Sequence, residues 1–321
     1  MGISIRDILW WVPGFRGLEK EHRRLVAQVT KLNAALEHER AARGTIAEFF
    51  PPGHFYSPLP SRDEIAAVFA RGGFGPPFAD VDLNEGGQMA RLERFALFYP
   101  EQPYPERATV GRRFYLDNPS YGHFDAIMLW SMLREAQPKR IIEVGSGFSS
   151  AAMLDARDHG RIGTPEFTFI DPDMARLRPL LRSGDEGRVT LIEKIVQEVP
   201  LETFAALREN DVLFIDSSHV SKIGSDVNRL FFDVLPALAP GVIIHIHDVA
   251  GNLDYPREWL EEGRAWNEQY LLRAFLMNNP AYRVELFTGW LFNTRHTWFR
   301  EHMPLCARGG GGQMWLRKIA K

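Results

Sequence analysis

The sequence predicts an α/β fold: a doubly wound, mostly parallel sheet of seven strands, preceded by a helical extension. Short apolar runs alternate with helical stretches from residue 140 onward, and this alternation is typical of a parallel sheet covered by helices on both faces. Two glycines one residue apart, Gly145 and Gly147, follow the first apolar run. Glycine at such a position permits a tight turn from a buried strand into a helix.

Composition and charge narrow the function classes. The chain has 321 residues, which suggests two domains or one domain with extensions. Its formal net charge of −3 argues against a generic nucleic-acid binder. A single cysteine, Cys306, excludes an intrachain disulfide and fits a reducing compartment, so we expect a cytoplasmic protein. We find no apolar run long enough to be a transmembrane segment.

Residues 1–45 form the first predicted segment. Trp10 and Trp11 lie in an aromatic-rich stretch that either packs on protein or rests on a membrane interface, and we favour packing. Residues 18–42 lack proline and glycine and predict a helix with one apolar seam. The seam has heptad spacing, weakened at His22, and consists of Leu18, Leu25, Val29, Leu32 and Leu36. This Leu18–Ala42 helix either joins copies into a homo-oligomer or lies on its own domain.

Residues 46–120 form the second predicted segment, because proline, glycine and aromatic residues are dense in its first part. Proline at this density breaks regular elements, so we expect an irregular segment with short helices at 62–70 and 87–98. It could be a lid over a pocket or packing around the core. Residues 121–321 then form the predicted core domain.

The core begins with a helix at 125–136, and Pro138 ends it before the first strand, which includes Ile141 to Val144. Ser149 and Ser150 can cap the helix that follows. Further strands are predicted at 166–171, 188–192, 211–216, 241–248, 282–287 and 313–318, with helices at 151–159, 174–182, 200–209 and 225–238. The carboxyl ends of parallel strands share one edge, where ligands bind. Polar residues and glycine fall at that edge: Glu143, Gly145, Asp171, Asp216, His247 and Asp248.

Four stretches together resemble one family. They are IIEVGSGFSS at 141–150, FIDPD at 169–173, VLFIDSSHVSKIGSDV at 212–227 and APGVIIHIHDV at 239–249. In this order they resemble the class I S-adenosylmethionine-dependent methyltransferases, in the branch that includes small-molecule and sugar O-methyltransferases. The resemblance covers residues 124–321 and does not reach residues 1–110. It implies a Rossmann-like methyltransferase fold and S-adenosylmethionine as cofactor.

The resemblance also implies where that cofactor binds. The glycine turn would surround the methionine part, and the carboxylate of Asp171 would accept hydrogen bonds from the ribose hydroxyls. The alternative for Asp171 is a helix N-cap before Pro172. Gln197 would contact adenine. The implied cofactor residues are Glu143, Gly145, Ser146, Gly147, Asp171, Gln197 and Asp216.

Methyl transfer to a hydroxyl needs a base or a metal, because an alcohol is a poor nucleophile. His219, in the loop beyond Asp216, is the predicted general base; the alternative is a histidine bonded to the backbone. In metal-dependent relatives, acidic residues at these two strand tips hold magnesium. The implied ligands are Asp216, His247 and Asp248, where His247 departs from the acidic pattern. Imidazole suits manganese, iron or zinc better than magnesium, so the metal stays open.

The predicted function is methyl transfer to a hydroxylated small molecule, such as a sugar or a secondary metabolite. The loop after the fifth strand could read this acceptor through Asp254, Tyr255, Arg257, Trp259 and Trp266. Two alternatives remain. One is a metal-dependent hydroxylase-like enzyme on the same fold, since fold does not fix function. The other is a non-catalytic S-adenosylmethionine-binding scaffold subunit.

Overall fold

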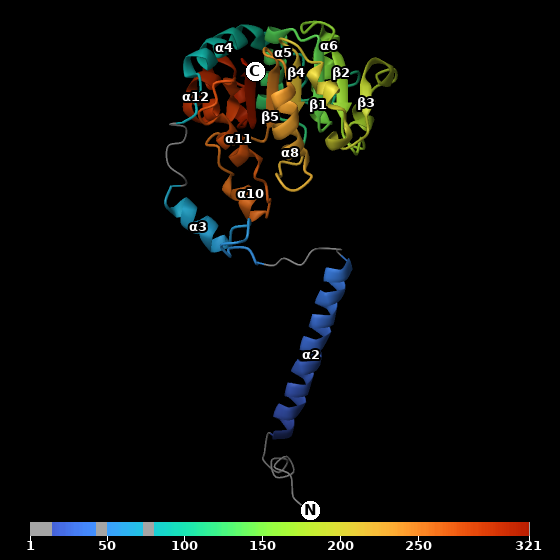
Figure 1. Ribbon diagram of the computed structural model, residues 1–321, viewed down its shortest axis with the longest axis vertical. Helices are drawn as coiled ribbons and strands as arrows, with labels where there is room; N and C mark the ends of the chain where they lie inside the picture. The colour runs from blue at the N-terminus through green and yellow to red at the C-terminus, as the bar shows by residue number, and fades with distance from the viewer. Residues whose placement is uncertain (1–14, 43–49, 73–79, 321) are drawn as a thin grey trace, which may run out of the picture. The chain divides into compact units, whose positions relative to one another are not determined.

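The computed structural model describes residues 15–42, 50–72 and 80–320 (Figure 1). The chain divides into two compact units, residues 1–60 and 61–321. This division follows contacts rather than composition, so the three predicted segments stay a prediction. Trp10 and Trp11 lie outside the described residues. No helix in the described ranges is both long and apolar enough to cross a bilayer.

The first unit contains one long helix, α2 (Phe15–Ala42), which confirms the helix predicted from residue 18. The apolar residues of its seam are exposed to solvent, from 46% at Leu36 to 72% at Leu18. Arg23 pairs with Glu19 one turn earlier, which stabilises the polar side of the helix. The helix therefore presents an apolar stripe that its own described side chains do not cover.

The second unit is built on a seven-stranded sheet in the order β3-β2-β1-β4-β5-β7-β6. The pairs among β1 to β5 are parallel, and β7 is antiparallel to both β5 and β6. This confirms the predicted doubly wound, mostly parallel sheet. The strands are β1 (Arg140–Val144), β2 (Glu166–Ile170), β3 (Thr190–Ile192), β4 (Val212–Ile215), β5 (Ile243–His247), β6 (Tyr282–Phe287) and β7 (Gln313–Lys318).

Alternate residues of each strand enter two separate hydrophobic cores, one on each face of the sheet. Ile141 and Phe214 belong to one core, whereas Ile142 and Leu213 belong to the other. The first core is covered by α4 (Glu85–Phe98), α5 (His123–Ala136), α6 (Phe148–His159) and α12 (Thr288–His302). The second is covered by α7 (Leu201–Ala205), α8 (Asp226–Arg229), η5 (Leu230–Val234), α9 (Leu235–Ala237) and α11 (Glu268–Leu276).

Three predicted helices differ from the structure. The helix expected at 174–182 is only a short 3-10 turn, η2 (Arg178–Leu180), because Pro179 lacks the amide that a longer helix would need. The helix expected from residue 151 begins at Phe148 instead. Ser150 Oγ accepts from the amide of Gly147, the N-cap residue, which confirms part of the predicted capping, and the hydroxyls of Ser149 and Ser150 also both donate to Glu143. The helix expected at 225–238 runs through α8, η5 and α9, with a π-helical turn at η5.

The proline-rich segment contributes core packing where the second unit begins. Its predicted helices are present as α3 (Arg62–Ala70) and α4. Tyr104, Phe114 and Leu116 are buried in the same core as α6, and the Tyr104 hydroxyl donates to the carbonyl of Ala152. Residues 104–116 are therefore packing rather than a lid.

Candidate active site

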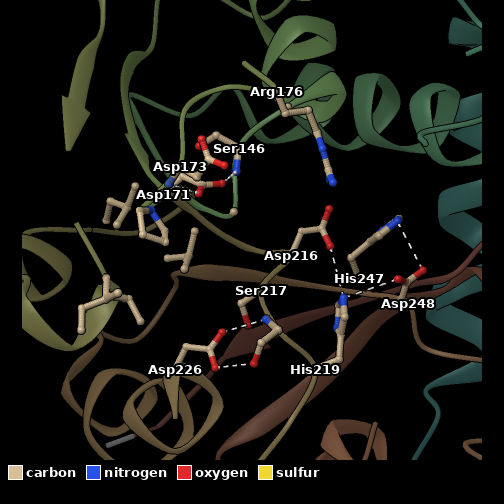
Figure 2. Close-up of a pocket in the computed structure, with 18 of the residues that line it drawn as sticks. Ser146, Asp171, Asp173, Arg176, Asp216, Ser217, His219, Asp226, His247 and Asp248 are labelled. Atoms are coloured by element: carbon tan, nitrogen blue, oxygen red, sulfur yellow. Dashed lines mark hydrogen bonds and ion pairs between the residues drawn. The ribbon is translucent and has the colours of Figure 1, made fainter. Parts of the chain in front are cut away.

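A cavity of about 980 Å³ opens at the carboxyl ends of β1, β2, β4 and β5 (Figure 2). The sheet order reverses beside β1, since β2 lies on one side of it and β4 on the other. This switch point is where open α/β sheets bind ligands. The cavity is large enough for a nucleoside-sized ligand together with a small second molecule.

The glycine turn forms one wall of this cavity. Gly145 has φ +85°, and a Cβ added there would lie 1.7 Å from the carbonyl oxygen of Asp216. Only glycine fits, because β4 approaches the turn too closely for any side chain. The three amides of the turn are used internally: they donate to Ile170 O, to the Asp171 carboxylate and to Ser150 Oγ. The turn is thus rigidly held before any ligand enters.

Glu143 lies behind the turn. It is fully buried, accepts a hydrogen bond of 2.5 Å from Ser149 Oγ and another from Ser150 Oγ, and is absent from the cavity wall. Burial raises its pKa to about 8, although both serine hydroxyls act in the opposite direction. The structure therefore shows Glu143 supporting the turn, and its predicted contact with the cofactor stays a prediction.

Asp171 follows β2 and lines the cavity. Its carboxylate accepts hydrogen bonds from the amides of Ser146 (2.8 Å) and Asp173 (2.9 Å), which link β2 to the glycine turn (Figure 2). It caps no helix, since the next one, η2, begins only at Arg178. The carboxylate is held at the position predicted for a ribose contact.

Four buried polar atoms of the wall have no hydrogen-bond partner in the described part of the chain. Ser146 Oγ and Gln197 Oε1 are on the side of the glycine turn and β3, and Ser217 Oγ and His247 Nδ1 are two further buried atoms of this kind. The amide nitrogen of Gln197 donates to Gly224 O at 2.7 Å, which fixes the side chain and leaves its oxygen as the unused acceptor. Buried polar atoms are normally satisfied, so this wall fits a polar ligand.

Three side chains from two neighbouring strand tips converge across the cavity from Asp171. One ligand atom each of Asp216, His219 and Asp248 lies within 4.8 Å of the other two. His219 Nε2 is 3.5 Å from Asp216 Oδ1 and 3.4 Å from Asp248 Oδ2. His219 and Asp248 both have positive φ, 61° and 55°, a conformation that is uncommon outside glycine and concentrates at functional sites.

The sequence did not indicate Glu268, which fixes the His219 ring. Its Oε2 is 2.9 Å from His219 Nδ1, and its side chain is 3% exposed. The amides of Asn267 and Glu268 also donate to the carbonyl of His219, so the start of α11 holds both backbone and ring. The two residues are 49 positions apart, and only the fold brings them together.

The charge of the three converging groups follows from their mutual contacts. Burial lowers the pKa of His219, but hydrogen bonds with Asp216 and Glu268 outweigh it and raise that pKa to about 10. Burial raises the pKa of Asp216, yet the charges of His247 and His219 hold it below its ordinary value. Without a cation bound, the site therefore holds a protonated imidazole beside carboxylates.

His247 lines the same cavity but is not one of the three converging side chains, so its predicted role as a metal ligand stays a prediction. Its Nε2 lies 3.7 Å from Asp248 Oδ1, and its ring lies 5.2 Å from that of Tyr121. Burial lowers its pKa, but the negative charges of Asp216, Asp248 and Asp125 outweigh burial and raise it. The imidazole that joins the two predicted carboxylates is that of His219.

The loop after β5 supplies an aromatic wall. Trp259 and Trp266 line the cavity with their ring centroids 5.1 Å apart, and the guanidinium of Arg264 lies over both, at 4.8 and 4.6 Å. Trp266 also contacts the His219 ring at 4.5 Å. The other residues expected to read an acceptor lie outside the cavity wall: Asp254, Tyr255 and Arg257.

Comparisons with known proteins agree with this site. Residues 142–249, from β1 to just past β5, match the family model described as a methyltransferase domain. An uncharacterized protein of Archaeoglobus fulgidus is 31% identical over 174 residues, which are 51% of this chain and 76% of that protein.

Two solved structures are similar at a lower level. The SAH-bound methyltransferase PaMTH1 of Podospora anserina has 16% identity and a TM-score of 0.40, covering 82% of this chain and 99% of its own. The O-methyltransferase TomG of Streptomyces achromogenes, in complex with SAM, has 16% identity and a TM-score of 0.38, covering 72% and 90%. Similarity at this level adds nothing to the assignment. The family model and the seven-stranded sheet of the second unit show that the chain belongs to the class I S-adenosylmethionine-dependent methyltransferases.

Proposed function

We propose that this enzyme transfers the methyl group of S-adenosylmethionine to a hydroxyl group of a small molecule, with a divalent cation at the acceptor. The observation that carries the proposal is the convergence of Asp216, His219 and Asp248 in the same cavity as the glycine turn and Asp171. The donor half and the acceptor half of the reaction then share one enclosed space, as an in-line displacement requires.

The first half of the cavity suits the donor. Asp171 offers a carboxylate that is already fixed by two amides and can accept further hydrogen bonds from a ribose. Gln197 and Ser146 offer the unused oxygens described above, of which Gln197 Oε1 suits the amino group of adenine. S-adenosylmethionine supplies an activated methyl group on a sulfonium; the residues of this wall bind and orient it.

The second half suits a metal ion. Two carboxylates and one imidazole are a donor set for magnesium or manganese, whereas non-haem iron oxygenases use two histidines and one carboxylate. Glu268 bonds to Nδ1 of His219, which leaves Nε2 facing the carboxylates of Asp216 and Asp248. A histidine held by a carboxylate in this way is common around bound metals. The donor set thus favours methyl transfer over the hydroxylase alternative. A divalent cation held here would acidify a coordinated hydroxyl.

His219 fits a ligand better than the predicted general base. A ring whose pKa is about 10 keeps its proton at neutral pH, so in the metal-free protein it cannot accept one. Once Nε2 is a ligand, no lone pair remains for a proton. The residues that can then take up the acceptor proton are the carboxylates of Asp216 and Asp248.

Trp259 and Trp266 give the acceptor side an aromatic surface of two rings set at 73° to each other, and Trp266 contacts the ring of His219. Such a surface suits the apolar face of a sugar or an aromatic ring. The chain's remaining predicted properties are a cytoplasmic location, no nucleic-acid partner, and association of copies through α2. The exposed heptad seam of α2 supports that last expectation.

The experiment is calorimetric titration of S-adenosylmethionine into the purified protein, with and without manganese or magnesium, followed by methyl transfer to a panel of hydroxylated acceptors. We expect donor binding without metal and transfer that depends on metal. Asp171→Ala should weaken donor binding on the order of 10- to 100-fold, because a charged hydrogen-bond acceptor is lost. Asp173→Ala, on the same wall, is the matched control. Wild-type protein that binds no donor would support the scaffold alternative instead.

A further inference from the structure

The cavity wall contains an arginine side chain that bonds neither to the glycine turn nor to Asp216, His219 and Asp248. Arg176, from the segment after β2, points into the cavity toward Asp216 (Figure 2). It makes no hydrogen bond or ion pair with another side chain in the described ranges. A Cβ added at Gly147 would lie 2.8 Å from Arg176 Cδ, so the arginine crosses the turn at contact distance.

Two other features beside Arg176 suit an anion. Phe148 and Ser149, the first two residues of α6, line the cavity, and their amides precede the first intrahelical bond, from Ala151 N to Gly147 O. Free amides at a helix N-terminus favour negative charge. Ser146, which is 5% exposed, adds an Oγ without a partner among the described residues. Arginine, helix end and hydroxyl therefore border the same part of the cavity.

The other arginine and lysine side chains of the cavity wall lie away from the glycine turn. Arg264 is bonded to Glu262 and stacked on the two tryptophans. Lys194 and Lys222 come from the loops after β3 and β4, on the side where Gln197 bonds Gly224. Of these cavity-lining cations, Arg176 is the one next to the glycine turn.

We propose that Arg176, with the N-terminus of α6 and the Ser146 hydroxyl, binds the α-carboxylate of the donor's methionine part. The inference rests on the proposed function, because it concerns the same donor. The turn's own amides cannot do this work without breaking the bonds to Ile170, Asp171 and Ser150 that hold the turn. A guanidinium is suited to a carboxylate, since it presents paired donors in one plane.

The test compares two donors that differ only in this carboxylate: S-adenosylmethionine and its decarboxylated analogue. Wild-type protein should bind the first on the order of 10- to 100-fold more tightly. Arg176→Met should lose most of that preference, with weaker binding of S-adenosylmethionine and analogue affinity within about twofold of wild type. Arg176→Lys should retain part of the preference, because it keeps the charge but not the paired donors.

Binding of the analogue reports whether each variant still folds. The matched control is Arg178→Met, because Arg178 lies two residues further on and pairs with Glu186 and Glu193 outside the cavity wall. Equal loss of affinity for both donors in Arg176→Met, or no loss for either, would overturn the inference. Wild-type protein that binds S-adenosylmethionine without preferring it also overturns the inference but leaves the proposed function intact. Wild-type protein that binds neither donor overturns both.

Discussion

At the scale of single residues, Glu143 couples folding to pH. Its buried carboxyl keeps a proton up to a pH of about 8 in the folded chain, whereas it titrates near 4.5 when exposed. The folded state then binds more protons than the unfolded state between these values, so this residue's contribution to stability falls as pH rises through that window and is constant above it. We expect Glu143→Gln to remove this slope, so that the variant gains stability relative to wild type from pH 5 to 8.

Urea unfolding at several pH values from 5 to 9 measures this difference. Glu166→Gln is the comparison, because the Glu166 side chain is 79% exposed. A constant difference between Glu143→Gln and wild type across the range would show that the carboxyl is ionised in the folded protein. The serines would then hold a charged group rather than a neutral one.

Glu268 offers a second test at the same scale. If His219 is a metal ligand, manganese must displace the proton that its pKa of about 10 retains at pH 7.5. We expect wild-type protein to release about one proton per manganese ion bound, measured by calorimetry in buffers of different ionisation enthalpy. Glu268→Gln should weaken manganese binding by about 10- to 100-fold and release fewer protons, since the variant ring holds its proton less tightly.

The control for Glu268→Gln is Glu261→Gln, which removes a carboxylate paired with Arg257 away from the cavity wall. A purely structural role for Glu268 predicts a loss of stability with an unchanged proton count. Unchanged manganese affinity in Glu268→Gln would contradict the ligand role of His219.

At the scale of elements, the sequence predicted strands better than helices. Each of the seven strands is a short apolar run bounded by polar turns in the sequence. Each is present within a few residues of its predicted range. The prediction of a helix at 174–182 was wrong. Its composition suits a helix, but Pro179 and the turn at Asp173 favour the shorter element that the structure contains. Ser150 accepts from the N-cap amide of Gly147 as a capping residue can, but no sequence pattern indicated that Ser149 and Ser150 would both also donate to the buried Glu143.

The candidate site was predictable to the extent that it follows strand tips. Asp171, Asp216 and Asp248 lie at the edge where parallel strands end, which the alternation of elements already fixes. The convergence of His219 with Asp216 and Asp248 was not predictable, because it depends on which way the imidazole ring turns. His219 points inward since α11 bonds both its carbonyl and its Nδ1, and no local pattern links residues 219 and 268. The place of Arg176 in the cavity wall was also not predicted, because no local pattern around residue 176 indicates it.

At the scale of the whole molecule, the cavity and the exposed apolar seam belong to different parts of the chain. The cavity is lined by residues between 120 and 266, in the second unit. The exposed seam belongs to α2, in the first. In heptad terms Leu18, Leu25 and Leu32 share one position, and His22, Val29 and Leu36 share the other, so the seam has the spacing with which helices pair. The polar His22 would fix the register of such a pair at some cost in stability.

We therefore expect the double variant Leu25→Asp, Leu32→Asp to reduce the mass of the full chain in solution to that of a monomer, measured by light scattering. Charges in the middle of the seam would be buried without partners in any coiled coil. Affinity for S-adenosylmethionine should stay within about twofold of wild type, because the described cavity-lining residues all lie outside α2. Thr30→Asp, off the seam on an exposed turn of α2, is the matched control and should leave the mass unchanged. A wild-type chain that is already monomeric, or a double variant that keeps the wild-type mass, would remove α2 from the assembly. A double variant that loses donor binding together with its oligomeric state would show that the site needs the second copy.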